Sequence, residues 1–494
     1  MKNRLIEKRY IFGNVPFTTV ILGIFMGIVA GIILYYTVSR SITIFMTGIA
    51  CFILIVPFLI IYHKIAKRFL IAVLILTLPL VIDKTINVDS LHQGGAKGFV
   101  ISLHDIALAF LFIIWINDIV VNRKSGIRFF KRFTIVVLGI ISMAALSMIK
   151  AADRMFAIYE LIEIFKMYLI MIYIANYIAE SGDIKYVVTF LIIGLLIEGV
   201  LVLIELASGS PLNMTVLGTK SAVDTIEFSK HRVGGTLGGA NGLAWYLDYI
   251  LPLVFAVIIN RIRKSYRIIL TFVFLLGVIS LIFTFSRGGW IAFLIGSSIV
   301  LLFYLRRLPM IKKLYIAVVI ILILGVSLML ILSVPNPIKE RFTVDDRGSA
   351  YSRVKLAEVA FAMIKSNPVI GVGLNNYTLV HHEYDYGVDK ITSYYPVPVH
   401  NVFLQLAAEI GIPGVVFFIV FIFLIYINSS RYVLSSDGFG GCILTGIMGG
   451  ITAGLVQAMV ENSSLGSYNL LPFWFLSGVA IGIYEHKRDN ETGD

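Results

Sequence analysis

Long apolar runs alternate with short polar connections along most of the chain. A run of about 20 apolar residues crosses a bilayer as a helix, because lipid offers no partner to unpaired backbone groups. The recurring runs therefore predict an all-α polytopic membrane protein. Several runs are short for a span, so the expected number of transmembrane helices is about 12–14. The candidate spans are 17–36, 41–62, 69–82, 101–121, 133–149, 155–179, 186–206, 241–260, 268–285, 289–305, 314–333, 411–427, 440–460 and 470–484.

The composition supports this class, with 58% hydrophobic and only 14% charged residues. The net charge of +12 gathers in short connections such as HKIAKR, NRKSGIRFFKR and RIRKSYR. The positive-inside rule places these connections in the cytoplasm, and the N- and C-termini with them. The basic residues therefore define the topology, and we expect membrane lipid but no nucleic acid as a partner.

Two connections are long, and both face away from the cytoplasm in this orientation. Loops of such length in a compact protein are usually functional or disordered. They lead us to divide the chain into four parts. These are N-terminal transmembrane helices (1–206), a transmembrane core (207–333) with an outer loop (207–240), a large helical extracytoplasmic loop (334–410) and C-terminal transmembrane helices (411–494).

The second long loop contains two predicted amphipathic helices. GSAYSRVKLAEVAFAMIKSNP predicts a helix that lies against the membrane and ends at Asn367-Pro368. HNVFLQLAAEIGIPG predicts a shorter helix with Asn401 as N-cap, and Gly411 to Gly414 separate it from the next span. The apolar stripes are Tyr351, Val354, Phe361 and Ile364 in the first helix, and Phe403, Leu406, Ala407 and Ile410 in the second.

Three arginines face the same outer surface in this topology. Arg287 stands at the end of a span in LIFTFSRGGW, Arg232 precedes a glycine-rich stretch, and Arg353 lies in the first amphipathic helix. A guanidinium group binds phosphate oxygens through a rigid two-pronged fork, so the set suits a phosphate or pyrophosphate at the membrane. The alternatives are headgroup contacts for Arg287 and Arg353 and a loop salt bridge for Arg232.

His400 is the candidate for proton transfer. It stands beside the N-terminus of a predicted helix, where the positive end of the dipole disfavours imidazolium and leaves a neutral imidazole as a base. The alternative is a histidine that caps or packs. Glu163 and Lys166 lie within a predicted span, where they either neutralise each other or line a polar cavity.

A metal site is not expected. HHEYDYGVD and the Asp345-Asp346 pair contain residue types that ligate metals, but their spacing matches no strong metal signature. We therefore predict that no metal or other cofactor takes part.

Four stretches together resemble the O-antigen ligase and O-antigen polymerase superfamily of bacterial membrane glycosyltransferases. They are RVGGTLGGANGLAWYL, SRGGW, NPVIGVGLNNY and HNVFLQLAAEIGIPG, in the family's order over roughly residues 230–430. The resemblance implies a fold related to the C-type glycosyltransferases. It also implies a site on the outer face of the bacterial cytoplasmic membrane, an undecaprenyl-pyrophosphate-linked glycan as donor and a second glycan as acceptor.

The same resemblance assigns roles to individual residues. The family's outer-loop histidine, proposed to activate the acceptor hydroxyl, falls on His400, and its essential arginine falls on Arg287. Pyrophosphate-binding arginines fall on Arg232 and Arg353. Asn241 is retained as a further pyrophosphate-binding candidate, although this chain has GGAN where the family usually has a sequence closer to GNPN.

Three functions follow as hypotheses. The first is polymerisation of lipid-linked repeat units into a surface polysaccharide, which would involve a flippase and a chain-length regulator as partners. The second is a ligase that transfers a finished glycan to an outer acceptor. A sequence rich in Lys, Ile and Asn suggests a low-GC host, where lipid A is not expected as an acceptor, and this favours the polymerase. The third is a glycan transporter or flippase, but transporters concentrate charge near the bilayer midplane and often contain repeats.

Overall fold

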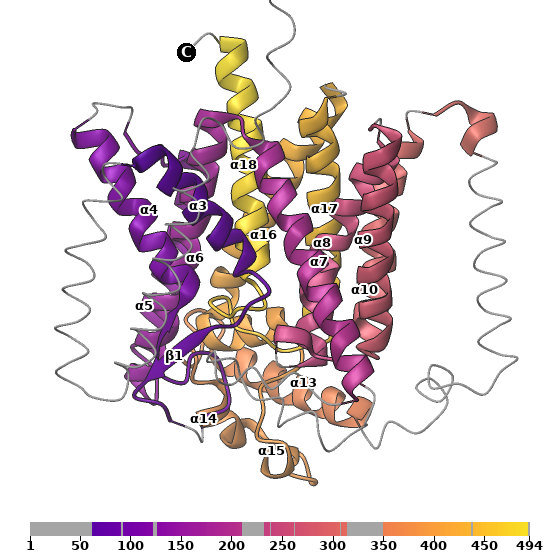
Figure 1. The fold of residues 1–494 in the computed structure, drawn as a ribbon. Helices are drawn as coiled ribbons and strands as arrows, with labels where there is room; N and C mark the ends of the chain where they lie inside the picture. The colour runs from indigo at the N-terminus through magenta and orange to yellow at the C-terminus, as the bar shows by residue number, and fades with distance from the viewer. Residues whose placement is uncertain are drawn as a thin grey trace, which may run out of the picture. The chain divides into compact units, whose positions relative to one another are not determined.

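The computed structural model describes residues 62–89, 92–121, 126–209, 232–237, 239–260, 262–306, 308–313, 349–435 and 438–492 (Figure 1). The chain forms two compact units, which we describe separately. The first comprises 1–73 and 106–126, and the second comprises 74–105 and 127–494. The described helical residues of the first unit belong to α3 (His63–Leu76) and α4 (Leu103–Val120), which both continue into the second.

The second unit contains most of the described elements and all of the candidate site. Its further elements, in chain order, are β1 (Asp83–Ile86), β2 (Phe99–Ser102), α5 (Lys131–Ser147), α6 (Arg154–Ser181), α7 (Ile184–Ser208), η3 (Gly235–Leu237), α8 (Ala240–Ile259), α9 (Lys264–Phe283), α10 (Arg287–Leu305), α13 (Ser349–Ser366), α14 (Tyr377–Val380), η4 (His381–Tyr384), α15 (Ile391–Tyr394), α16 (Val402–Ser435), α17 (Phe439–Ala458) and α18 (Leu471–Thr492).

Seven helices within the described residues are long and apolar enough to cross a membrane. They are α4, α7, α8, α9, α10, α16 and α17, and each coincides with a predicted span. α5, α6 and α18 coincide with three more predicted spans, and α3 overlaps a fourth, 69–82, only over residues 69–76. These four helices are too short or too polar to count as spans by length and composition. The expected spans 17–36, 41–62 and 314–333 lie outside the described residues. The prediction of an all-α polytopic membrane protein is confirmed.

Glycines bring the central helices of the second unit close together. α17 packs against both α8 and α10. Gly449 of α17 faces Gly296 of α10, and Gly450 lies against the Tyr249 carbonyl of α8 so closely that no Cβ fits. Gly478 and Gly482 of α18 approach α6 in the same way. Small residues at such contacts are typical of membrane helices, which associate through close packing rather than through the hydrophobic effect.

The second unit has two distinct ends. α8 and α10 begin at one end, beside β1, β2 and the helices α13 to α15, and we call this the loop end (Figure 1). At the opposite end, α5 and α9 begin and α10 and α18 terminate. We call it the basic end because it carries IRKSYR (262–267) and FFKR (129–132). The loops and the basic connections therefore lie at opposite ends of this unit.

A two-stranded sheet at the loop end was not expected from the sequence. β1 and β2 pair antiparallel, with Asp83 opposite Ser102 and Ile86 opposite Phe99. Each strand has only four residues and adjoins an apolar run, so neither gives a period of two long enough to recognise. The predicted span 101–121 therefore begins two residues late, at Leu103.

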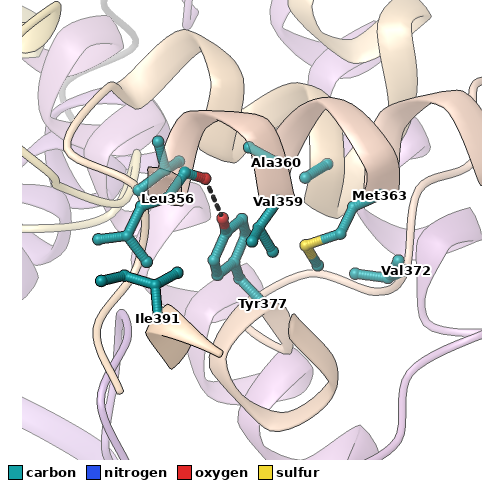
Figure 2. Close-up of a cluster of buried hydrophobic side chains, with 9 residues drawn as sticks. Leu356, Val359, Ala360, Met363, Val372, Tyr377 and Ile391 are labelled. Atoms are coloured by element: carbon teal, nitrogen blue, oxygen red, sulfur yellow. Dashed lines mark hydrogen bonds between the residues drawn. The ribbon is translucent and has the colours of Figure 1, made fainter. Parts of the chain in front are cut away.

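The described part of the second long loop, residues 349–410, which we call the outer loop from here on, has a small hydrophobic core of its own (Figure 2). One side of α13 contributes Leu356, Val359 and Met363, and the segments after α13 contribute Tyr377 and Ile391. Burial raises the pKa of the Tyr377 hydroxyl. The opposite side of α13 is the predicted apolar stripe, and it remains open. Tyr351, Val354 and Phe361 are 51%, 59% and 59% exposed, whereas Ile364 packs partly against the core.

The hydrogen-bond ladder of α16 is interrupted near its start, and backbone groups of the outer loop bond to the groups left unpaired there. Gly411 has φ 79 and ψ 170, which is not helical, and Pro413 has no N–H to offer the Glu409 carbonyl four residues earlier. Backbone groups of residues 368–373 form the missing bonds. Val372 N donates to Ala408 O (2.8 Å), Gly373 N donates to Glu409 O (3.0 Å), and Ile412 N donates to Pro368 O (2.8 Å).

These backbone bonds between the loop and α16 account for the glycines of NPVIGVGLNNY and EIGIPG. Gly371 and Gly411 both have positive φ, and a Cβ on either would overlap a backbone carbonyl of the other segment. The boundary drawn at 410/411 from the sequence therefore falls at a kink inside α16, with the loop bonded to both sides of it. The expected N-cap is also present, since Asn401 Oδ1 accepts from Leu404 N at 3.0 Å.

Candidate functional site

Two glutamates of α7 hold the turn that carries Arg232. Glu205 accepts hydrogen bonds from Gly234 N (3.3 Å) and Gly235 N (2.9 Å). Glu198 accepts from both Thr236 N (2.8 Å) and Thr236 Oγ1 (2.7 Å). Gly235 has φ 55, and a Cβ there would collide with the Glu198 carboxylate. The amides of this glycine-rich stretch are therefore bound within the protein rather than free to hold a phosphate.

Arg232 extends from that turn toward α8 and α10. Its Nε donates to Thr284 O (2.9 Å), just before α10, and a terminal nitrogen donates to Asn241 Oδ1 (2.9 Å). Bonds to a carbonyl and to a side-chain amide thus fix the direction of this guanidinium. Arg232 and Asn241, which lie close in sequence, form one connected pair at the first turn of α8.

Glu461 joins this pair to the rest of the predicted site. The residue follows α17, and its side chain is only 12% exposed. Asn241 Nδ2 donates to Glu461 Oε1 (3.0 Å), and a terminal nitrogen of Arg353 lies 3.4 Å from the same oxygen. His400 Nδ1 lies 3.7 Å from Glu461 Oε2, within ion-pair range but beyond a hydrogen bond. Four of the predicted residues, including Arg232 through Asn241, are therefore connected around one carboxylate.

Glu461 was not singled out by the sequence. It follows an apolar run directly, which is the position of an ordinary interfacial charge. The signal available was its place at the outer end of a predicted span, on the same surface as the arginines and His400. That signal alone does not distinguish it from other acidic residues on the same side.

Arg287 is the first residue of α10, and the surrounding motif fixes the start of that helix. Ser286 Oγ accepts from Gly289 N (3.3 Å) as N-cap, and Trp290 Nε1 donates to Leu281 O (3.0 Å). Phe285 has φ 50, an uncommon conformation for a non-glycine residue. SRGGW is thus a tight connection from α9 into α10.

The two glycines after Arg287 allow α10 to approach its neighbours. A Cβ at Gly288 would lie 2.8 Å from Gln457 Oε1 and Val460 Cγ2, and one at Gly289 would lie 2.9 Å from Ala244 Cβ. These contacts hold Arg287 beside the end of α17. Glu461 follows α17 directly in the sequence. Its guanidinium makes no hydrogen bond or ion pair with the residues that the structure describes, so it remains available to a ligand.

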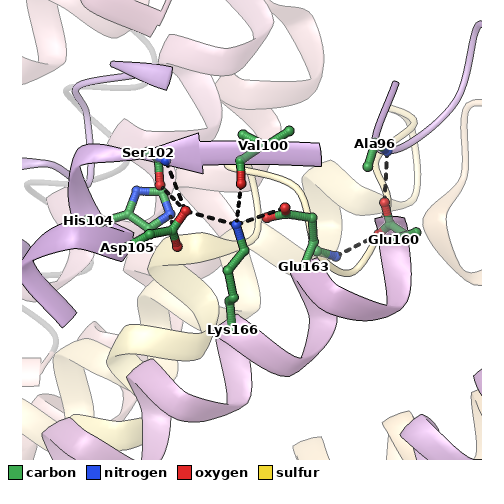
Figure 3. A network of polar contacts seen from close by, with 9 residues as sticks. Ala96, Val100, Ser102, His104, Asp105, Glu160, Glu163 and Lys166 are labelled. Carbon is green, nitrogen blue, oxygen red and sulfur yellow. Dashed lines mark hydrogen bonds and ion pairs between the residues drawn. The ribbon is translucent and has the colours of Figure 1, made fainter. Parts of the chain in front are cut away.

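Glu163 and Lys166 belong to a separate network on α6 (Figure 3). Lys166 Nζ lies 2.8 Å from both Glu163 Oε1 and Asp105 Oδ2, and it donates to Val100 O of β2 at 3.0 Å. Glu160, on the same helix, accepts from Ala96 N (2.9 Å) and Gly466 N (3.0 Å). These contacts favour the structural pair over the cavity-lining role.

The paired asparagines of NPVIGVGLNNY bind the outer loop to the segments around α6. Asn375 Oδ1 accepts from His92 Nε2 (2.9 Å), and Asn375 Nδ2 donates to Ala96 O (2.8 Å). Asn376 Oδ1 accepts from Asp153 N (2.7 Å). The backbone hydrogen bonds between residues 368–373 and α16 form an interlock between the loop and that helix. Together with this interlock, the asparagine bonds determine where the loop presents Arg353 and His400.

Asp385, in the HHEYDYGVD stretch of candidate metal ligands, has structural partners. No group of three or more His, Cys, Asp or Glu side chains suited to a metal occurs in the described parts of the chain. Asp345 and Asp346 lie outside those parts. Asp385 accepts from Thr392 N (3.0 Å) and Thr392 Oγ1 (2.9 Å). Burial alone would raise the pKa of Asp385, but bonds from Thr392 and Gly387 bring it below its usual range.

The spans and the glycine-packed helices define a multi-pass membrane protein. Residues 270–419 match the family described as O-antigen ligase. The resemblance drawn from the motifs is confirmed. The match supports transfer of a lipid-linked glycan at the level of the family. No curated protein matches the chain.

Proposed function

We propose that this chain is a polymerase that joins undecaprenyl-pyrophosphate-linked oligosaccharide repeat units into a surface polysaccharide, on the outer face of the bacterial cytoplasmic membrane. The observation that carries the proposal is the meeting of Arg353, His400 and Asn241 at Glu461. These residues come from the outer loop, α8 and the end of α17, so only the folded chain unites them.

The charges around Glu461 suit an anionic donor. A carboxylate and a phosphate oxygen bind guanidinium groups in the same way. Glu461 lies 3.4 Å from a terminal nitrogen of Arg353 and neutralises its charge. A bound pyrophosphate would replace Glu461 as the partner of Arg353. It would also bind Arg287, which has no protein partner among the described residues. Arg232 and Asn241 complete the anion-binding edge.

His400 supplies the base. The acceptor hydroxyl attacks the anomeric carbon, its proton passes to the imidazole, and the bond from that carbon to the phosphate oxygen breaks. Pyrophosphate leaves as an anion stabilised by the fixed arginines, which is electrostatic stabilisation of developing charge. A single displacement inverts the anomeric centre. Glu461, 3.7 Å from Nδ1, faces the imidazole and stabilises its protonated form.

The test is chain-length analysis with the purified full-length protein in liposomes, supplied with a lipid-pyrophosphate-linked repeat unit as the only glycan. A ladder of products spaced by one repeat unit supports polymerisation. A single transfer that requires an added non-repeat acceptor would make the protein a ligase. Movement of the donor across the bilayer with no new glycosidic bond would make it a flippase. His400→Ala in the same liposomes is the inactive reference.

A further inference from the structure

A cavity lies at the basic end, away from the residues around Glu461. It has a volume of about 400 Å³ and lies between the start of α5 and the last parts of α16 and α18. That volume is within the range of small-molecule sites, about 300–1,000 Å³. Asn428, on its wall, is separated from the Gly411 kink by about 25 Å of helix, at 1.5 Å per residue. The cavity is therefore not part of the glycan site.

Positive charge predominates around this cavity. Arg128, Lys131, Arg132 and Arg488 line it, with Glu485 as the only acidic lining residue. Arg488 pairs with Glu485 and Arg128 pairs with Asp489, which leaves those charges compensated. Lys131 and Arg132 form no hydrogen bond or ion pair with the described residues. Lys131 is thus exposed without a direct acidic partner there, and Arg132, also exposed, is only partly compensated through its electrostatic interaction with Glu485.

The backbone adds to this preference for an anion. α5 begins at Lys131 without a side-chain N-cap and without an acidic residue in its first turn. The first amides of a helix and the positive end of its dipole attract an anion. Here they accompany the exposed side chains of Lys131 and Arg132, which line the same cavity.

Aromatic residues form the remaining walls. Phe129, Phe130, Phe133 and Tyr484 line the cavity, and Phe129 is 56% exposed. Such walls gain nothing from a free inorganic anion but suit glycerol and acyl carbons. Basic pockets between membrane helices on the cytoplasmic side bind anionic lipid headgroups. We propose that this cavity binds the headgroup of one anionic phospholipid, with its phosphate at Lys131 and Arg132.

Native mass spectrometry of the full-length protein in detergent tests this assignment. The protein is titrated with dioleoyl phosphatidylglycerol and, separately, with dioleoyl phosphatidylcholine, which has the same acyl chains and no net charge. We expect one phosphatidylglycerol to bind at least about tenfold more tightly than phosphatidylcholine. Lys131→Gln with Arg132→Gln should remove that difference. Millimolar inorganic phosphate should not displace the lipid.

Two further variants separate charge at this cavity from charge in general. Lys312→Gln with Lys313→Gln removes an adjacent pair of cations in the segment after α10, outside the cavity lining, and should leave binding unchanged. Lys131→Arg with Arg132→Lys keeps both charges and should retain binding. Equal affinity for the two lipids, unaltered binding by the double glutamine variant, an equal loss in the Lys312/Lys313 control, or displacement by inorganic phosphate would each overturn the proposal.

Discussion

The Asn241 amide donates a 3.0 Å hydrogen bond to the Glu461 carboxylate, which links the first turn of α8 to the end of α17. Each of the two residues also contacts an arginine: Asn241 accepts a hydrogen bond from Arg232, and Glu461 pairs with Arg353. A carboxylate in this position keeps like-charged guanidinium groups together when no substrate is bound. The same carboxylate faces His400, so its removal tests both roles.

Glu461→Gln should reduce transfer, because the variant keeps a similar shape but loses the carboxylate charge that faces the imidazolium formed when His400 accepts the proton. Binding of the lipid-pyrophosphate donor should be retained or become tighter, since Arg353 loses its competing carboxylate. Turnover and donor binding are measured separately on the purified protein. Glu358→Gln, an exposed partner of Lys355 on α13, is the matched control. Equal losses in donor binding and turnover would show that Glu461 only maintains the fold.

His400→Ala should lower turnover by roughly 10²–10⁴-fold, the usual effect of removing a general base. Donor binding should change little, because the phosphate contacts come from arginines. Single-turnover transfer on a synthetic donor, together with donor binding, gives both quantities. His382→Ala removes an exposed histidine from the same outer loop and should behave as wild type. Turnover near wild type in His400→Ala would exclude this residue as the base.

Arg287→Lys should also fail in transfer, although it preserves the charge. A lysine is a point charge and cannot reproduce the two-pronged contact of a guanidinium with phosphate oxygens. Transfer and donor affinity are measured on the monodisperse variant. Arg306→Lys, at the other end of α10, provides the comparison. If Arg287→Lys is as active as that control, Arg287 is an interfacial anchor that contacts headgroups.

Acidification should destabilise the outer loop through His92. The ring stacks on Phe156 at 3.9 Å, and burial lowers the pKa of His92 below 6.5, although the Asn375 hydrogen bond opposes this. Below about pH 6.5 the unfolded chain therefore binds a proton that the native chain does not, so the free energy of unfolding falls as pH decreases. Burial lowers the pKa of His381 in the same direction.

Melting temperatures between pH 8 and pH 5 measure this effect. His92→Gln should be less stable at pH 8, because it loses the ring stack, and should show a shallower decline toward pH 5. His382→Gln should keep the wild-type slope. An unchanged slope in His92→Gln would assign the acid sensitivity to other groups.

Gly411→Ala should destabilise the protein by about 1–3 kcal/mol through backbone strain alone, because alanine disfavours the positive φ found there. Overlap of the new Cβ with the Val369 carbonyl adds to the loss. Thermal unfolding in detergent provides the measurement. Gly239→Ala is the control, since that residue has extended backbone and open space where a Cβ would stand. Equal melting temperatures for the two variants would contradict the interlock.

The membrane helices of this fold could be predicted because lipid imposes a simple rule on them. α7, α8 and α17 follow their apolar runs to within a few residues. The cap at Asn401 could also be predicted, since it depends on local sequence. The strands β1 and β2 could not, because four residues carry too little periodicity.

The site was predictable in part. Charge, topology and resemblance singled out Arg232, Asn241, Arg353 and His400 as candidates, and the fold brings these four residues together. Glu461 was missed because its neighbours in space come from other segments. The interlock was missed for a related reason: Pro413 shows that the Glu409 carbonyl needs another donor, but not that Gly373, far away in sequence, provides it.

The interlock between residues 368–373 and the break in α16 has a consequence for protein engineering. Three backbone bonds cross between the loop and the helix, and they depend on glycine rather than on any particular side chain. The outer loop therefore cannot be excised as a soluble fragment without opening a membrane helix. Chimaeras that exchange acceptor or donor preference between relatives should place their junctions after Tyr377 and before Val399, where the exchanged segment leaves those backbone bonds intact.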